Sequence, residues 1–216
     1  MVYAALAKET GRFLCIVTPG EAEATRFAGD LNALGIPTAV FPARDYVLRP
    51  IEGTAREYEY RRLSVLGDIV GGRLQAVCVP DEGLTQYTTP RAEFCNNTRT
   101  LHPGDTVPRT ELTALLYNAG YARRAQVDGP GQFSIRGDIV DLYAPDMKLP
   151  VRMEFWGDEI DTMHTFDLAT QRREDPIEKI YVSPAREVLF GSPAEAAELL
   201  RAFIKKFRGK KRTALE

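Results

Sequence analysis

One short segment, VRMEFW at residues 151–156, carries the side chains of this chain that are best suited to recognition chemistry. The period of two in a β-strand puts Arg152, Glu154 and Trp156 on one face and three apolar residues on the other. Arginine and tryptophan are enriched at protein–protein hot spots, because each combines contact area with directed hydrogen bonding. The pattern predicts either a protein-binding face or a solvated sheet face on which Trp156 covers an arginine stem.

A further arginine stands at a turn that precedes an apolar pair. Gly137 separates Arg136 from Asp138 directly before Ile139 and Val140. A glycine in such a place indicates a bulge or a tight bend. We therefore expect the bend to direct the Arg136 side chain outward from a sheet.

The residue patterns of common enzymatic sites are missing from the sequence. The turn at residues 18–23 holds one glycine and two carboxylates, whereas a phosphate loop needs several glycines, a lysine and a serine or threonine. Two histidines and three widely spaced cysteines without a CxxC pair suit neither a nucleophilic set nor a zinc site. We expect no catalytic residue, no cofactor and no metal; a residual nucleotide hydrolase is the alternative, which binding of ATP with magnesium would reveal.

Composition limits the class of protein. The 216 residues carry 28 Lys and Arg against 30 Asp and Glu, a formal net charge of −2, and 44% of them are hydrophobic, enough for a real core. Six of the basic residues crowd positions 205–212, so the rest of the chain is acidic, which disfavours a protein that coats nucleic acid. An odd number of cysteines, no signal peptide and no long apolar span predict a soluble cytoplasmic protein without membrane contact.

Strands and helices alternate in the first third of the chain. Short apolar runs at 13–18, 38–41 and 75–79 predict buried strands, and amphipathic segments at 21–34 and 56–70 predict helices between them. Strands joined by crossover helices imply a parallel sheet. We expect a small α/β layer in this part of the chain.

After Pro90 the pattern predicts an antiparallel α+β module. A short helix is expected at 110–119. Strand candidates separated by Gly-Asp or Pro-Asp turns follow it, at 132–135, 139–143, 151–156 and 159–167.

The last part of the chain predicts one more helix. Beyond Pro184 an amphipathic segment at 194–207 precedes the basic tail, and nothing later in the sequence could cover its apolar stripe. We therefore expect the chain to end within a longer protein, with Leu215 and Glu216 as a cloning junction.

From Gly120 to Arg172 the chain strongly resembles the module shared by the bacterial transcription-repair coupling factor (Mfd) and the excision-repair protein UvrB. The matching run is GYARRAQVDGPGQFSIRGDIVDLYAPDMKLPVRMEFWGDEIDTMHTFDLATQR. Three other segments resemble the coupling factor, so that the resemblance covers nearly the whole chain: FPARDYVLRPIEG, REYEYRRLSVL and SPAREVLF. UvrB carries a working phosphate loop at its first strand, and because this chain has none, the resemblance favours the coupling factor.

The resemblance implies a fold class and a domain layout. Residues 1–97 would form a degenerate, P-loop-NTPase-like parallel α/β subdomain, similar to UvrB domain 1a with its nucleotide site lost. Residues 98–184 would form an inserted, mainly antiparallel α+β subdomain, similar to UvrB domain 2, that docks UvrA. Residues 185–216 would begin a following, truncated subdomain. The full-length parent would be an ATP-dependent DNA translocase that meets RNA polymerase and DNA through other domains.

Five positions match the family's UvrA-contacting positions, the last of them more weakly. They are Arg136, Arg152, Glu154, Trp156 and Arg123. The resemblance implies that Arg136 and Arg152 donate to acidic groups on UvrA. It also implies that Glu154 holds one of these arginines in register and that Trp156 fills an apolar pocket.

The chain departs from the family pattern at two positions. Trp156 stands where phenylalanine or tyrosine is usual, and Ser134 stands where UvrB tends to have a further arginine. The affinity for UvrA is therefore expected to differ while the docking mode is kept. Charge reversal at Arg152 is expected to abolish binding without unfolding the domain.

The resemblance thus implies a non-catalytic interaction module that recruits UvrA to stalled RNA polymerase in transcription-coupled nucleotide excision repair. The alternative is a DNA-binding module that acts through the basic run at 205–212, which a steep salt dependence of DNA affinity would reveal.

Overall fold

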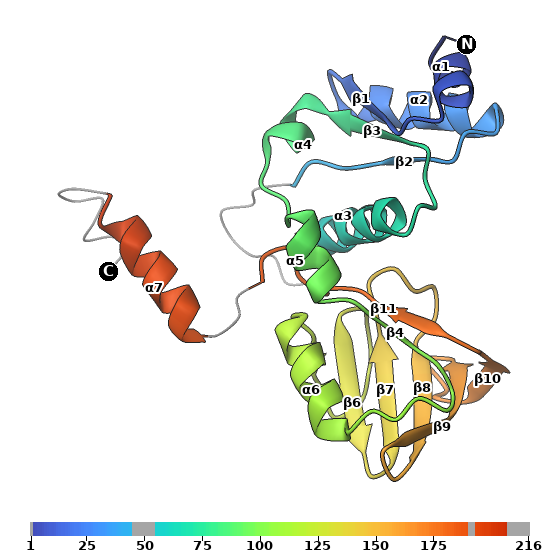
Figure 1. The fold of residues 1–216 in the computed structure, drawn as a ribbon, viewed down its shortest axis with the longest axis vertical. Helices are drawn as coiled ribbons and strands as arrows, with labels where there is room; N and C mark the ends of the chain where they lie inside the picture. The colour runs from blue at the N-terminus through green and yellow to red at the C-terminus, as the bar shows by residue number, and fades with distance from the viewer. Residues whose placement is uncertain (1, 45–54, 190–192, 207–216) are drawn as a thin grey trace.

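The computed structural model describes residues 2–44, 55–189 and 193–206. The two larger of three sheets lie one above the other along the long axis of Figure 1, each with its own helices. Helix α7 (Pro193–Ile204) stands apart from both sheets in the same view. The chain therefore has a mixed architecture, with a parallel sheet first and a mainly antiparallel sheet second.

The first sheet is parallel, as the alternation of strands and helices predicted. Its strands are β1 (Leu14–Thr18), β2 (Thr38–Val40) and β3 (Ala76–Pro80), in the order β1-β3-β2. The crossover helices α2 (Glu21–Ala33) and α3 (Ala55–Val70) pack on opposite faces of it. Each predicted strand and helix of this layer is present, with ends shifted by one residue at most.

Burial on both faces explains why β3 is an unbroken apolar run. Cys78 packs in a cluster with Leu31 of α2, whereas Val77 and Val79 pack with Val65 of α3. A strand covered on both faces has no need of polar residues at alternate positions. The central position of β3 thus follows from its composition.

Three helices of the first part have no clear signal in the sequence. They are α1 (Val2–Thr10), α4 (Asp81–Thr85) and α5 (Arg91–Asn96). No acidic residue marks the first turn of α1, and no side-chain cap marks the start of α4 or α5. Because α4 and α5 are also too short to show a helical period, tertiary contacts decide them.

The second sheet has six strands in the order β10-β9-β8-β7-β6-β5. Their bounds are β5 (Ala122–Arg123), β6 (Gln132–Arg136), β7 (Ile139–Tyr143), β8 (Val151–Trp156), β9 (Glu159–Phe166) and β10 (Arg173–Pro176). The four predicted strands, β6 to β9, are antiparallel neighbours, as expected. The short strand β5 was not predicted, and it pairs parallel to β6.

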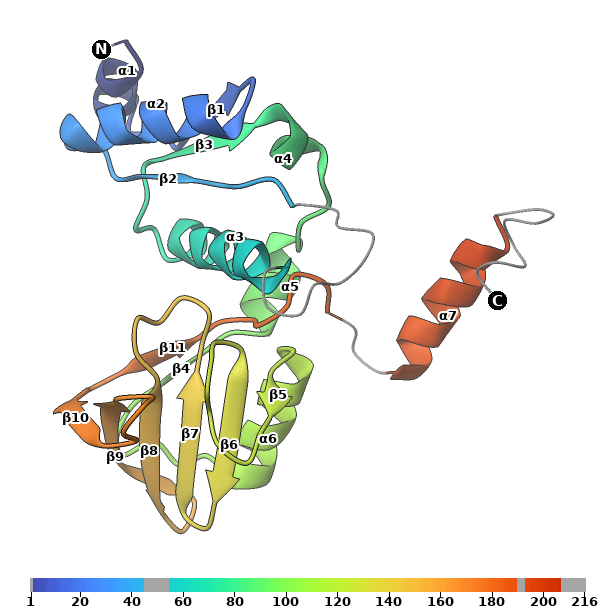
Figure 2. The ribbon, with the colours of Figure 1, turned by 180° about the vertical axis from the view of Figure 1, so that it is seen from behind.

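One face of this sheet is buried against helix α6 (Arg109–Asn118) and a two-stranded sheet of β4 (Arg99–Leu101) and β11 (Ile180–Val182). Leu112 of α6 and Met153 of β8 belong to the same buried cluster. Strands β6 to β9 lie side by side in Figure 2, with β5 in front of α6. We call the face turned away from α6 the outer face.

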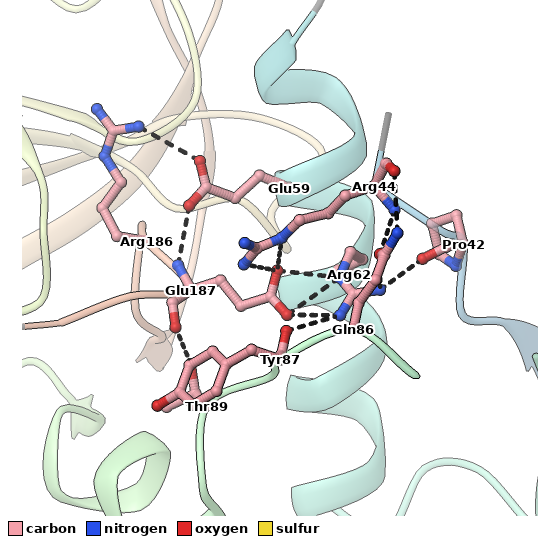
Figure 3. A network of polar contacts seen from close by, with 9 residues as sticks. All are labelled: Pro42, Arg44, Glu59, Arg62, Gln86, Tyr87, Thr89, Arg186 and Glu187. Carbon is pink, nitrogen blue, oxygen red and sulfur yellow. Dashed lines mark hydrogen bonds and ion pairs between the residues drawn. The ribbon is translucent and has the colours of Figure 1, made fainter. Parts of the chain in front are cut away.

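A buried ionic network joins the two parts of the chain (Figure 3). Glu187, which follows β11, lies beside Arg62 of α3, and both side chains are 0% exposed. Arg62 donates from Nε and Nη2 to the carboxylate of Glu187 at 2.8–3.0 Å, and Arg44 reaches the same carboxylate at 2.6 Å. Arg62 Nη1 also donates to the carbonyl of Pro42 at 2.7 Å. The network thus links the segment that follows β11 to α3 and to the segment that follows β2.

Substituting Glu187→Gln is expected to lower the free energy of unfolding by about 3 kcal/mol, because the buried Arg62 guanidinium then lacks a full counter-charge. Urea denaturation followed by circular dichroism measures the change. Glu178→Gln, at an exposed residue, is the matched control and should leave stability unchanged. Equal stability of the two variants would contradict the structural role of the network.

The same network predicts acid sensitivity. Burial acts to raise the pKa of Glu187, but the hydrogen bonds and charges of Arg62 and Arg44 outweigh it, so the pKa is lowered. A carboxylate with a lowered folded-state pKa contributes its full stability above the ordinary value of about 4.3 and loses it as the pH falls through the folded-state pKa. The stability difference between the wild type and Glu187→Gln should therefore shrink below about pH 4. Denaturation curves from pH 7 downward test this, and a difference that stays constant would refute it.

Candidate protein-docking face

Strand β8 divides its side chains between the two faces of the second sheet as its period of two predicted. Val151, Met153 and Phe155 are buried in the cluster beneath the sheet. Arg152, Glu154 and Trp156 therefore lie on the outer face, the first two partly buried and the third exposed. The structure brings three of the predicted contact residues together on one strand.

A buried aspartate ties two of the arginines together. Asp141 of β7 lies directly opposite Arg152 of β8, and its side chain is 0% exposed. Arg152 donates from Nε to Oδ1 at 2.7 Å and from Nη2 to Oδ2 at 3.0 Å, while Arg136 Nη2 donates to Oδ2 at 2.5 Å. Two guanidinium groups thus share one carboxylate.

The Arg152 guanidinium contacts Phe166 and Gln171 in addition to Asp141. Its guanidinium carbon lies 4.6 Å from the centroid of the Phe166 ring, and Nη1 donates to the carbonyl oxygen of Gln171 at 3.1 Å. The hydrogen bonds that Arg152 donates to Asp141 raise the pKa of the guanidinium. Only 14% of the side chain is exposed. Its guanidinium is therefore largely committed to contacts within the chain.

Arg136 and Trp156 present more surface. Arg136 ends β6, and 45% of its side chain is exposed, as expected from the bend at Gly137. Trp156 ends β8, pairs with Glu159 across a tight turn, and is 83% exposed. Gly157 makes that turn at a φ of 63°, a region that glycine enters without steric cost. The outer face thus carries an exposed aromatic group and a half-exposed cation.

The prediction that Glu154 pairs with Arg136 or Arg152 was wrong. Its carboxylate pairs with Arg173 of β10, and Thr162 Oγ1 donates to it at 3.4 Å. The predicted contact to Arg136 or Arg152 is replaced because both arginines turn to Asp141. Glu154 consequently neutralises a cation of β10, across the intervening strand β9.

The weaker candidate, Arg123, lies on β5, next to β6 in the sheet. It is exposed, and within residues 2–44, 55–189 and 193–206 its side chain forms no ion pair. Ser134, by contrast, is buried on the row of Asp141, and its Oγ donates to the carbonyl of Ala125 at 2.9 Å. Ser134 is therefore a buried packing residue. An arginine at this position would lie directly opposite Asp141 in the sheet.

Sequence reasoning missed Asp141 and Gln171. A carboxylate at the centre of the apolar strand IVDLY is a usable signal, because an ionised side chain is rarely buried without a partner. Gln171 gives a weaker one. It adopts a positive φ of 59°, which a single sequence does not reveal for a residue other than glycine.

The turn that leads from β1 into α2 carries acidic residues. Glu21 and Glu23 stand in the first turn of α2, and Arg61 of α3 lies 3.5 Å from Glu21. Carboxylates at a helix N-terminus interact favourably with its dipole and compete with a bound anion. Among the described residues, no group of His, Cys, Asp or Glu side chains is arranged to hold a metal ion. The same residues contain no helix long and apolar enough to cross a membrane.

Most of the basic run at 205–212 lies outside the described residues. Only Lys205 and Lys206 are described, directly after the end of α7, and both are exposed.

Comparisons with known proteins agree with the motifs. The UvrB interaction domain family matches residues 100–188, which include the whole outer face and Glu187. A transcription-repair-coupling factor of Bacillus subtilis is 27% identical over 91% of this chain, and one of Staphylococcus aureus is 30% identical over 69%. The chain spans 17% and 13% of the length of these two relatives. Residues 100–188 therefore belong to the UvrB interaction domain family, and the resemblance to the transcription-repair coupling factors that the motifs predicted is confirmed over most of the chain.

Proposed function

We propose that this chain is a non-catalytic interaction module whose outer face binds UvrA. One observation carries the proposal: an almost fully exposed Trp156 shares a sheet face with Arg136, which is half exposed and anchored on a buried carboxylate. The membership of residues 100–188 in the UvrB interaction domain family supports a docking role for this part of the chain. The resemblance supplies UvrA as the partner.

The two exposed residues suit different parts of an interface. A tryptophan that is 83% exposed offers a large apolar area, which gains most when a pocket on the partner removes it from water. Arg136 donates one hydrogen bond to Asp141, and its other N–H groups are available to an acidic group of the partner. Two guanidinium groups against one carboxylate leave an excess of positive charge here.

The other predicted contact residues take supporting parts in this proposal. Arg152 braces Asp141 and offers only its small exposed edge to a partner. Glu154 and Arg173 form a neutral pair beside it. Arg123 pairs with Phe133, whose side chain is buried beneath the sheet, so Arg123 lies on the α6 side at the β5 edge and adds no charge to the outer face.

The wider role follows the resemblance. The parallel layer at residues 1–97 would be a degenerate nucleotide-binding fold, which the carboxylates of Glu21 and Glu23 at the start of α2 support. The full-length protein would recruit UvrA to stalled RNA polymerase in the cytoplasm. Contacts with RNA polymerase and DNA, and ATP-dependent translocation, would belong to its other domains.

Substituting Trp156→Ala is expected to weaken UvrA binding by about 2 kcal/mol or more, roughly 30-fold, because a buried contact with the partner is lost. The stability of the free chain should not change, because the Trp156 side chain is mostly exposed to solvent. Titration calorimetry of the chain against UvrA measures the affinity. Tyr87→Ala is the matched control, since Tyr87 is an exposed aromatic residue between α4 and α5, outside the second sheet, and the change keeps the backbone carbonyl that Arg62 contacts. Unchanged binding by Trp156→Ala, or equal losses in both variants, would refute the assignment of the face.

The contacts of Arg152 argue against the expectation that charge reversal there spares the fold. A glutamate at this position would face the buried carboxylate of Asp141. Even the uncharged change Arg152→Met is expected to lower the free energy of unfolding by about 3 kcal/mol, because Asp141 loses its braced partner. Arg136→Met should cost about 1 kcal/mol or less, since this arginine is half exposed.

Urea denaturation of both variants, with Arg123→Met as a surface control, tests this ranking. Equal stability of Arg152→Met and Arg123→Met would show that the Asp141 contacts contribute little. Binding experiments should accordingly rest on Trp156 and Arg136.

A further inference from the structure

Asp141 is the most enclosed charged group of the outer face, and the binding role inferred above uses it only as the anchor of Arg136. It lies at the centre of β7, between β6 and β8, and its side chain is 0% exposed. Each of its oxygens accepts from a guanidinium, at 2.5–3.0 Å. A partner protein cannot reach it, so any effect of Asp141 on docking must pass through the arginines.

We propose that Asp141 is the positioning residue of the docking face: it holds the Arg136 guanidinium in the orientation in which UvrA receives it. The inference rests on the proposed function of the outer face. Arg152 takes part as a brace, because its contacts with Phe166 and Gln171 fix the plane of its guanidinium and with it the carboxylate of Asp141.

Ordering a long side chain at an interface costs conformational entropy. The Arg136 side chain has already lost part of this entropy in the free chain, because a charge-assisted hydrogen bond to the buried carboxylate of Asp141 restricts its guanidinium. Among the described residues, Asp141 is the acceptor that contacts the Arg136 guanidinium. Arg136 thus combines a fixed position with an exposed surface, and this combination suits a contact residue.

Substituting Asp141→Asn tests the proposal with little change of size. An amide offers one acceptor oxygen instead of two, and its NH₂ group faces guanidinium donors. In either orientation at least one guanidinium donor faces the NH₂ group, and any hydrogen bond that Arg136 keeps is no longer assisted by a negative charge. Titration calorimetry against UvrA should show about a tenfold loss of affinity for Asp141→Asn and a similar loss for Arg136→Ala.

The double variant separates positioning from a structural effect. If Asp141 acts through Arg136, Asp141→Asn should cost little further affinity once Arg136 is alanine, because coupled residues give non-additive changes. Thermal melting confirms that each variant is folded at the temperature of the titration. Losses that multiply in the double variant, or wild-type affinity in Asp141→Asn, would overturn the proposal.

A second measurement needs no partner. The ¹⁵N relaxation of arginine Nε–H groups in the free chain reports side-chain order, and Arg136→Lys and Arg123→Lys assign the two signals. The proposal expects Arg136 to be ordered and Arg123, which is exposed without an ion pair among the described residues, to be mobile.

The two measurements fail in different ways. An Arg136 signal as mobile as that of Arg123 in the wild type would overturn the positioning role even if Asp141→Asn does not fold. An ordered Arg136 that stays ordered in folded Asp141→Asn would overturn it as well. Absence of UvrA binding by the wild type would refute the proposed function, and the relaxation data alone would then decide whether Asp141 orders Arg136.

Discussion

The structure depends on the burial of one carboxylate between its two sheets. Glu187 is 0% exposed and takes hydrogen bonds from Arg62 and Arg44. Removing such a charge from water is costly unless partners surround it. The contact therefore forms only when the residues after β11 lie against α3 and the end of β2. This requirement sets how the candidate docking face is held on the α/β layer.

The same contact gives a physical meaning to three motifs of the sequence. Arg44 lies in FPARDYVLRPIEG, Arg62 in REYEYRRLSVL and Glu187 in SPAREVLF. The resemblance to the coupling factor singled out these segments, but nothing local connects them, because more than a hundred residues separate Arg62 from Glu187. The structure shows that all three meet in one network (Figure 3).

The sequence predicted best those elements whose burial repeats with a period. Strands β1 to β3 and the helices between them were predictable from apolar runs and amphipathic stretches, and so were β6 to β9. Short elements such as α4, α5 and β5 have too few residues to show a period. The parallel pairing of β5 depends on where the chain returns to the sheet, which local composition does not encode. The boundaries near residues 97 and 184 remain an interpretation from the resemblance.

For the candidate site, too, the sequence predicted what depends on a single strand and missed what depends on pairing between strands. The period of β8 placed Arg152, Glu154 and Trp156 on one face correctly, because that depends on one strand alone. Which acid meets which arginine depends on the register between strands, and Asp141 faces Arg152 only in the observed pairing of β7 with β8. A bulge between β8 and β9 then changes the register beyond Glu154.

The two ionic networks repeat one design. In each, a fully buried carboxylate is shared by a more buried and a more exposed arginine: Arg62 and Arg44 on Glu187, Arg152 and Arg136 on Asp141. The enclosed arginine compensates the buried charge and fixes the carboxylate. The more exposed arginine is then oriented by a carboxylate that is itself fully buried. Between the sheets this arrangement links two parts of the chain, and on the outer face it leaves Arg136 hydrogen-bonded and 45% exposed, a combination that suits the docking role proposed for this face.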